Sequence, residues 1–157
     1  MACLKWNSSV LIRVGWRSFI NLSSNQPNMM ASKPFTVTVH PFISSTPHSC
    51  AYERGNTYSR NALVFFGGLT SGPHTTPQID PLIQALLDDS DLSFSFWEFR
   101  MRSSYTGFGF SSLANDVEDI AALVKYLKEI GKEKIVLLGS STGSLRRSSN
   151  ETKTADT

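Results

Sequence analysis

The stretch Lys134-Ile135-Val136-Leu137-Leu138-Gly139-Ser140-Ser141-Thr142-Gly143 decides how this chain folds. Its first five residues are almost continuously apolar, which is typical of a parallel strand that is covered on both faces of a sheet. A G-x-S-x-G pattern follows at once and makes a sharp strand-to-helix turn that exposes the hydroxyl of its central serine, here Ser141. Gly139 and Gly143 leave room for the strand and the helix to pass closely. The stretch therefore predicts a buried strand that ends in a nucleophile elbow.

Upstream of this stretch, strand patterns alternate with helix patterns. Residues 61–66 are mostly apolar and end at Gly67-Gly68, and residues 92–99 form a further strand candidate. Apolar residues recur at helical spacing in 79–87 and in 113–127. This alternation predicts an α/β fold with a mostly parallel sheet and flanking helices.

The segment before the first buried strand has a different pattern. In residues 34–40, apolar Phe35, Val37 and Val39 alternate with Thr36, Thr38 and His40, which predicts a strand with one face in water. His40 and His48 lie beside prolines at strand ends or turns. We expect both histidines to be surface or hydrogen-bonded residues rather than catalysts.

The two ends of the chain differ from its middle, which is expected to be one partial domain over residues 34–143. Residues 1–33 contain four basic residues and no acid, a composition that fits a mitochondrial transit peptide. The alternatives are a disordered extension or a wrongly chosen start, since Met29 and Met30 stand just before the first strand-like segment. Residues 144–157 are polar and have neither strand nor helix periodicity, so they are expected to be a disordered tail. The cytoplasm is the default compartment, and mitochondria are the alternative.

Composition argues against several classes of partner. The net charge of +2 comes from the basic residues that precede the first acid, Glu53, and the rest of the chain has no basic stripe for nucleic acid. No apolar run approaches the roughly 18 residues of a membrane span. The two cysteines, Cys3 and Cys50, show no metal-ligand spacing. No nucleic acid, membrane, metal or cofactor is therefore expected.

Three segments together resemble one known family. They are residues 61–69 (Asn-Ala-Leu-Val-Phe-Phe-Gly-Gly-Leu), 102–109 (Arg-Ser-Ser-Tyr-Thr-Gly-Phe-Gly) and 138–143 (Leu-Gly-Ser-Ser-Thr-Gly). They are similar to the DUF1749 (UPF0613) family of α/β-hydrolases, which includes fungal siderophore esterases. The resemblance covers about two-thirds of this chain and implies the amino-terminal half of an α/β-hydrolase fold.

The resemblance implies a role for several residues. Ser141 would be the nucleophile, and Gly68, Leu69 and Thr142 would border the oxyanion hole. Tyr105 would lie near the substrate entrance. Ser140 departs from the pattern, because many lipases and esterases have histidine at that position. The implied substrate is a small-molecule carboxylic ester, with siderophore-type esters as one class.

The remaining members of a catalytic triad do not follow the elbow. In this fold an acid and then a histidine come after the serine, but no histidine follows His74, and the only later acids are Glu151 and Asp156. We therefore expect an esterase that is truncated after its elbow and inactive as given. The alternative is a non-catalytic truncated isoform, or a mispredicted product, that acts by protein association.

The same reasoning makes a structural prediction about strand 134–138. With no further strand after the elbow, one edge of this apolar strand would have unpaired backbone groups. Such an edge is an aggregation hazard. The sequence therefore predicts possible self-association through an open strand edge.

Overall fold

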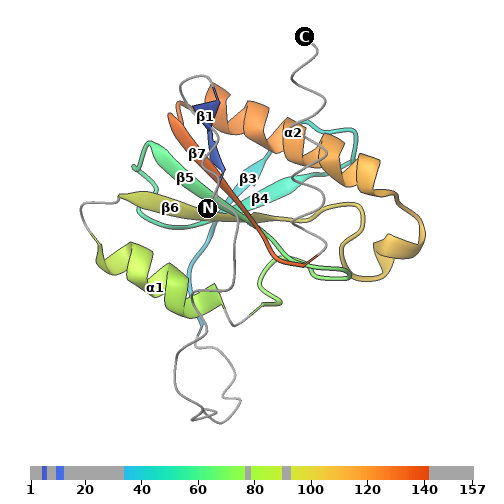
Figure 1. The fold of residues 1–157 in the computed structure, drawn as a ribbon, viewed down its shortest axis with the longest axis horizontal. Helices are drawn as coiled ribbons and strands as arrows, with labels where there is room; N and C mark the ends of the chain where they lie inside the picture. The colour runs from blue at the N-terminus through green and yellow to red at the C-terminus, as the bar shows by residue number, and fades with distance from the viewer. Residues whose placement is uncertain (1–4, 7–9, 13–33, 77–78, 90–92, 142–157) are drawn as a thin grey trace.

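Seven strands of the described residues form one sheet in the computed structural model, in the order β1-β2-β7-β5-β6-β4-β3 (Figure 1). The structure describes residues 5–6, 10–12, 34–76, 79–89 and 93–141. The strands are β1 (Lys5–Trp6), β2 (Val10–Ile12), β3 (Thr38–Pro41), β4 (Cys50–Gly55), β5 (Asn61–Phe66), β6 (Phe94–Phe99) and β7 (Lys134–Gly139). The helices are α1 (Asp80–Asp88), α2 (Leu113–Glu129) and the short 3-10 helix η3 (Tyr105–Gly109).

The centre of the sheet consists of the parallel strands β7, β5 and β6. Val64 of β5 pairs with Trp97 of β6 on one side and with Leu137 of β7 on the other. Their buried apolar runs confirm the predicted α/β fold, since each of these strands lies within two residues of its predicted bounds. Beyond β6, the strands β4 and β3 are antiparallel to their neighbours.

Each face of the sheet is covered by one helix (Figure 1). Helix α2 packs Ile120, Leu123 and Leu127 on one face in a cluster with the side chains of β5, β6 and β7 that point that way. Helix α1, together with Ile79 just before it, covers the opposite face. This arrangement follows from strand geometry, because successive side chains point to opposite faces.

The acids at the start of α2 do more than favour the helix dipole. Ser112 caps the helix in a reciprocal capping box with Asn115. Asp119, however, is buried and accepts hydrogen bonds from the Ser44 hydroxyl at 2.8 Å and from the Arg102 backbone N–H at 3.1 Å. Asp119 thus joins α2 to the loops after β3 and β6.

Strand β3 begins at Thr38, later than predicted, and His40 is its only residue that is not exposed. Val39 is 51% exposed, whereas the imidazole of His40 lies 3.1 Å from both the Tyr126 hydroxyl and the Glu53 carboxylate. His40 is therefore a hydrogen-bonded histidine, as expected. Strand β4, which supplies Glu53, was not predicted, because its sequence Cys-Ala-Tyr-Glu-Arg-Gly has no apolar alternation.

The predicted open edge of β7 is wrong over most of its length. Val10, Leu11 and Ile12 of β2 pair in parallel with Ile135, Val136 and Leu137. Strand pairing satisfies the backbone groups that an open edge would expose. The rest of the proposed leader and the tail 144–157 lie outside the described residues, so their predictions stay predictions.

Within the described residues, neither α1 nor α2 combines the length and the apolar character that crossing a bilayer requires.

Candidate active site

The loops that follow β5, β6 and β7 all begin where these parallel strands end, at the same end of the sheet. Among the described residues, four non-glycine residues in these loops have a positive φ: Thr70, His74, Tyr105 and Ser141, at 63°, 62°, 57° and 56°. Left-handed backbone at such residues costs about 1–3 kcal/mol each and clusters at functional sites. The clustering marks this end of the sheet as the candidate site.

Ser141 lies two residues beyond β7 and is exposed. The turn is tied to the neighbouring strand, because the N–H of Ser140 donates to the carbonyl of Phe66 at 3.0 Å. An exposed serine in a left-handed turn directly after a buried strand has the local geometry of a nucleophile elbow. The strained conformation holds the side chain away from the sheet.

Gly68 lies against Ser141. A Cβ built on Gly68 would stand 3.1 Å from Cβ of Ser141 and 3.5 Å from its Oγ, a tighter approach than most side chains allow. The structure thus brings the predicted nucleophile and one predicted oxyanion-hole residue together. Leu69, the next residue, is 52% exposed. Thr142 and Gly143 lie outside the described residues.

Tyr105 holds the loop that follows β5. Its backbone N–H donates to the carbonyl of Thr70 at 2.8 Å, and its hydroxyl donates to that of Pro73 at 3.4 Å. The phenol ring covers Gly72, where a Cβ would stand 2.1 Å from the Cζ atom of Tyr105. Tyr105 is therefore part of the wall of this loop, and at 44% exposure it also faces solvent.

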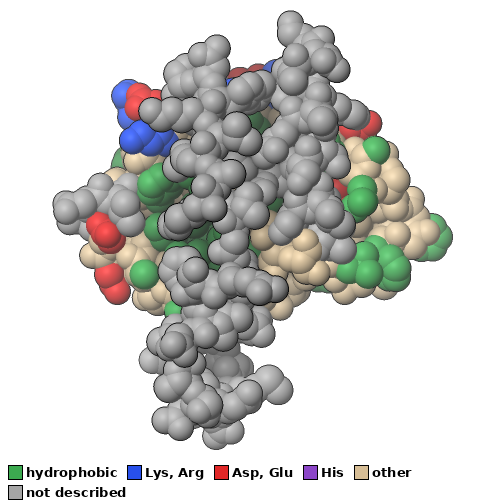
Figure 2. All heavy atoms as spheres, in the orientation of Figure 1, with side chains coloured by type: hydrophobic (Ala, Val, Ile, Leu, Met, Phe, Trp, Pro, Cys, Tyr) green, Lys and Arg blue, Asp and Glu red, His purple; other side chains and the backbone are tan. Residues whose placement is uncertain are grey.

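Apolar side chains are exposed near this loop. They belong to η3 and its neighbours, and Figure 2 shows hydrophobic side chains at that edge of the molecule. The exposed large apolar residues here are Tyr105, Phe108, Phe110 and Leu113. Exposed apolar side chains of this kind can contact the hydrocarbon part of a ligand.

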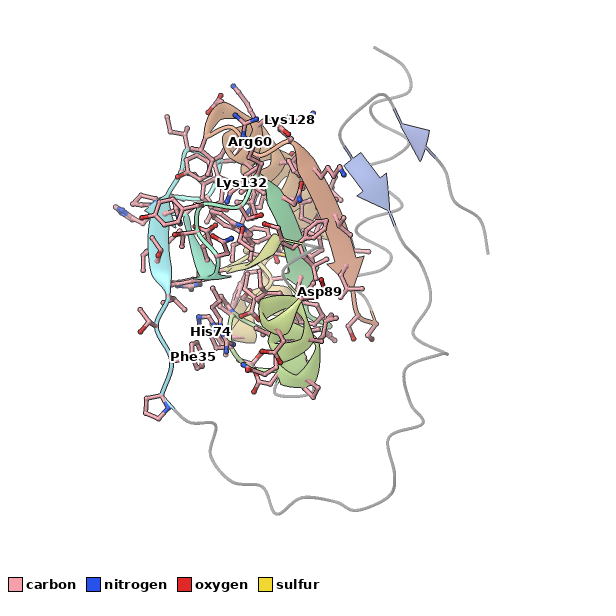
Figure 3. The ribbon with its side chains drawn as sticks, turned by 90° about the vertical axis from the view of Figure 1, so that its left-hand side faces the viewer. Phe35, Arg60, His74, Asp89, Lys128 and Lys132 are labelled. Atoms are coloured by element: carbon pink, nitrogen blue, oxygen red, sulfur yellow. The ribbon has the colours of Figure 1, made fainter. Side chains whose placement is uncertain are left out.

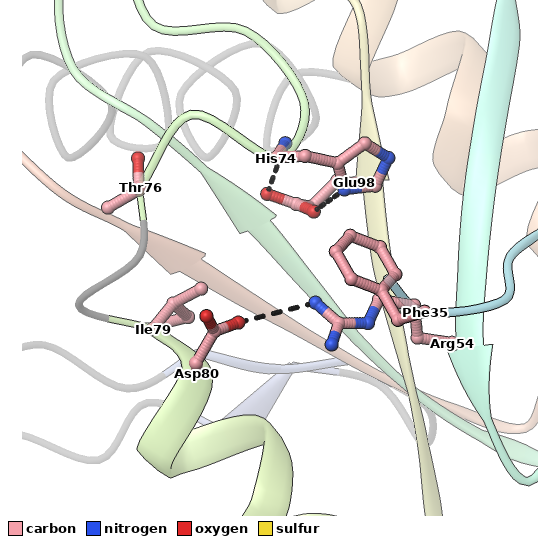
Figure 4. Close-up of a pocket in the computed structure, with 7 residues that line it drawn as sticks. All are labelled: Phe35, Arg54, His74, Thr76, Ile79, Asp80 and Glu98. Carbon is pink, nitrogen blue, oxygen red and sulfur yellow. Dashed lines mark hydrogen bonds and ion pairs between the residues drawn. The ribbon is translucent and has the colours of Figure 1, made fainter. Parts of the chain in front are cut away.

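A polar pocket that the sequence analysis missed opens on the α1 face (Figure 4). Its cavity of about 20 Å³ is lined by Phe35, Arg54, His74, Thr76, Ile79, Asp80 and Glu98. The imidazole Nδ1 of His74 lies 2.8 Å from the Glu98 carboxylate, and a guanidinium nitrogen of Arg54 lies 3.4 Å from Asp80. Burial raises the pKa of Glu98, and the charges of His74 and Arg54 oppose that rise. One signal could have found the pair: Glu98 is a lone acid within an aromatic strand.

No histidine of the chain lies beside Ser141 to act as its base. The sheet order places β6 two strands from β7 and β4 three strands away, which is about 10 and 14 Å at the usual strand spacing. His74 contacts Glu98 of β6 and Tyr52 of β4, and His40 contacts Glu53 of β4. His48 lies in the turn between β3 and β4.

In 34–76, 79–89 and 93–141 no group of three or more histidine, cysteine, aspartate or glutamate side chains is arranged to hold an ion.

Sequence comparisons find relatives of this chain. The family described as "Protein of unknown function (DUF1749)" matches residues 29–147. A UPF0613 protein of Schizosaccharomyces pombe is 38% identical over 91 residues, and the fusarinine C esterase of Aspergillus fumigatus is 35% identical over 102 residues. These matches cover 55% and 59% of this chain. The chain spans 28% of the length of each of these two relatives.

Solved structures show the same fold. A siderophore hydrolase of Aspergillus fumigatus superposes with a TM-score of 0.54 and 30% identity, over 69% of this chain and 35% of that one. A protein of unknown function with the α/β-hydrolase fold superposes with a TM-score of 0.61 and 20% identity, over 74% and 39% of the two chains. The sheet described above is thus a partial α/β-hydrolase fold.

Proposed function

The chain belongs to the DUF1749 family, and from this premise we propose that residues 34–143 supply the nucleophile and the oxyanion hole of a serine esterase. The observation that carries the proposal is the pairing of Ser141, in a left-handed turn after β7, with Gly68 from the loop after β5. Relatives that are named as esterases support the reaction class.

The proposed reaction is acyl transfer through Ser141. Its Oγ attacks the carbonyl carbon of an ester, its proton goes to a base, and the carbonyl oxygen becomes an oxyanion. The oxyanion is stabilised by backbone N–H groups beside Gly68 and by that of Thr142. Collapse expels the alcohol and leaves an acyl-serine, which water then hydrolyses.

The acyl and alcohol parts would be recognised by the exposed surface around the serine. Siderophore-type esters are the substrate class that we propose, because one relative is a fusarinine C esterase and a solved neighbour is a siderophore hydrolase. Leu69 and the apolar residues of η3 would contact the substrate.

We further propose that these 157 residues do not turn over esters on their own. The three histidines lie on the side of the sheet away from β7, and no histidine follows the elbow. A serine hydroxyl without a base is a weak nucleophile. Turnover would need an acid and a histidine from outside these residues.

The experiment has two arms. The chain is first incubated with a fluorophosphonate probe and a p-nitrophenyl ester, and neither labelling of Ser141 nor turnover is expected. The chain is then joined after Gly143 to the part of the fusarinine C esterase that follows the region aligned with this chain. This chimera should be labelled at Ser141 and hydrolyse the ester.

The chimera carrying Ser141→Ala is the control, and it should lose both the label and turnover. Labelling of the unmodified chain at Ser141 would contradict the requirement for an outside base. An active Ser141→Ala chimera would contradict the nucleophile assignment.

A further inference from the structure

The loop from Gly67 to Thr76 connects β5 to α1 and has a feature that the esterase proposal does not use. Its first part carries Gly68 against Ser141. Its last part is held by Glu98, a residue of the neighbouring strand β6. The contact with Glu98 at the far end of this loop can therefore influence the position of Gly68.

The Glu98 carboxylate binds His74 in two ways. One carboxylate oxygen accepts from the backbone N–H of His74 at 3.3 Å, and the other lies 2.8 Å from Nδ1 of the imidazole. The side chain of Glu98 is 5% exposed and that of His74 is 29% exposed. A buried carboxylate needs such partners, because burial without them is costly.

The imidazole is confined on its other sides as well. The rings of Phe35 and Tyr52 lie edge-on to it, with centroids at 5.3 and 5.2 Å. The titratable and charged groups that face the pair are Tyr52 and Arg54 of β4 and Asp80 of α1. Arg54 is itself stacked on Phe35, 3.7 Å from the ring centroid. The ring of His74 therefore has one well-defined position (Figure 4).

The loop is strained at both anchoring points. His74 has a φ of 62° and Thr70 a φ of 63°. Thr70 is held by the backbone of Tyr105, and His74 by Glu98. Left-handed residues persist only where the surroundings over-determine them. Loss of either anchor would let the loop relax toward ordinary backbone angles.

We propose that His74 and Glu98 are positioning residues whose contact holds the loop 67–76 so that Gly68 and Leu69 stay in place beside Ser141. The proposal rests on the proposed function for the use of Gly68 in an oxyanion hole. The structural link from His74 to Gly68 does not depend on that function.

A matched histidine allows a controlled test. His40 also lies within 3.1 Å of a buried glutamate, Glu53, but on the opposite face of the sheet. Figure 3 shows His74 and Phe35 together, at the end of the molecule opposite Lys132 and Arg60. The variants His74→Gln and His40→Gln thus remove similar groups at different distances from the loop.

The experiment is amide NMR on the full chain, with hydrogen exchange and a pH titration. In His74→Gln, amides of Ser71 and Gly72 should exchange about 10 to 100 times faster, the factor expected when a hydrogen bond to a charged group is lost. The Gly68 amide signal should also move. In His40→Gln both should stay as in the parent chain.

The pH titration separates positioning from general stability. As the pH falls through the raised pKa of the Glu98 carboxyl, the Gly68 amide signal should move in the parent chain and by the same amount in His40→Gln. In Glu98→Gln this response should shrink by at least half. If His74→Gln does not fold, the titrations of the parent chain and of Glu98→Gln still give the answer.

Two results would overturn the proposal. One is a Gly68 amide signal that moves with pH as much in Glu98→Gln as in the parent chain, and the other is a change of the Ser71, Gly72 and Gly68 amides that is as large in His40→Gln as in His74→Gln. Neither result depends on ester hydrolysis, so failure of this proposal and failure of the esterase proposal are distinguishable.

Discussion

The two faces of the sheet each have a histidine–glutamate pair, and the two carboxylates differ in their other partners. Glu53, on the α2 face, also binds the ammonium group of Lys132 at 2.8 Å, and that group in turn binds the carbonyl of Ser59 at 2.7 Å and lies over Trp97. Glu98, on the α1 face, has His74 as its direct partner and lines a cavity. The His40–Glu53 pair (the α2 pair) belongs to a closed core. The His74–Glu98 pair (the α1 pair) supports a strained loop.

This difference teaches where the molecule can respond to its surroundings. The network around Lys132 is 2–5% exposed at its two charged side chains and lies toward the start of the parallel strands. The burial of the Tyr126 hydroxyl raises its pKa, with Glu53 adding to the rise. The α1 pair lies at the opposite end of these strands, where Thr70, His74, Tyr105 and Ser141 are all strained.

The largest expected effect comes from Lys132→Met. The substitution leaves the Glu53 carboxylate buried without its cation, and breaking one side of a buried ion pair costs about 3–5 kcal/mol. The free energy of unfolding, measured by urea denaturation, should fall by that amount. Lys128→Met, on the exposed face of α2, is the matched control and should change stability by less than about 0.5 kcal/mol.

Arg54→Met provides the comparison on the α1 face. Its partner Asp80 is 38% exposed, so the loss should be about 1 kcal/mol or less. A loss as large as that of Lys132→Met would remove the distinction between the two faces.

A smaller effect is expected from the protonation of Glu98. Burial raises the pKa of Glu98 above the ordinary value of 4.5, so the folded state retains the proton at a pH where the unfolded state has released it. The resulting stabilisation is present below about pH 4.5 and is lost as the pH rises through the raised pKa. Urea denaturation from pH 4 to 7 should show this decline.

Glu98→Gln removes the titrating group and should flatten that part of the profile relative to the parent chain. Glu53→Gln, on the other face, serves as the comparison. An unchanged slope in Glu98→Gln would mean that the α1 pair does not respond to pH in this range.

The smallest effect is expected at Ser141 itself. Glycine tolerates a positive φ, so Ser141→Gly should relieve strain, although the greater freedom of glycine in the unfolded chain offsets part of the gain. The net change should be an increase of about 0.5 kcal/mol in the free energy of unfolding. Ser141→Ala keeps the strain and should show no increase. Equal effects of the two substitutions would show that the turn is unstrained.

The sequence by itself determined the centre of this protein. The apolar runs of β5, β6 and β7 and the helical periodicity of α2 predict the parallel core, because burial on both faces excludes polar residues from those strands. The elbow could also be read locally, since the strained turn is built from adjacent residues, and its serine does lie beside Gly68.

Only the tertiary structure decided the outer strands of the sheet and the contacts that hold the loop 67–76. Strand β4 was hidden because one of its two buried residues is Glu53, whose cation Lys132 is 79 residues away in the chain. The pairing of β2 with β7 and the contact of His74 with Glu98 likewise join distant segments. Local patterns report which side chains avoid water, but they do not report which distant charge or backbone edge will satisfy a polar group. That choice is made only when the strands and loops come together.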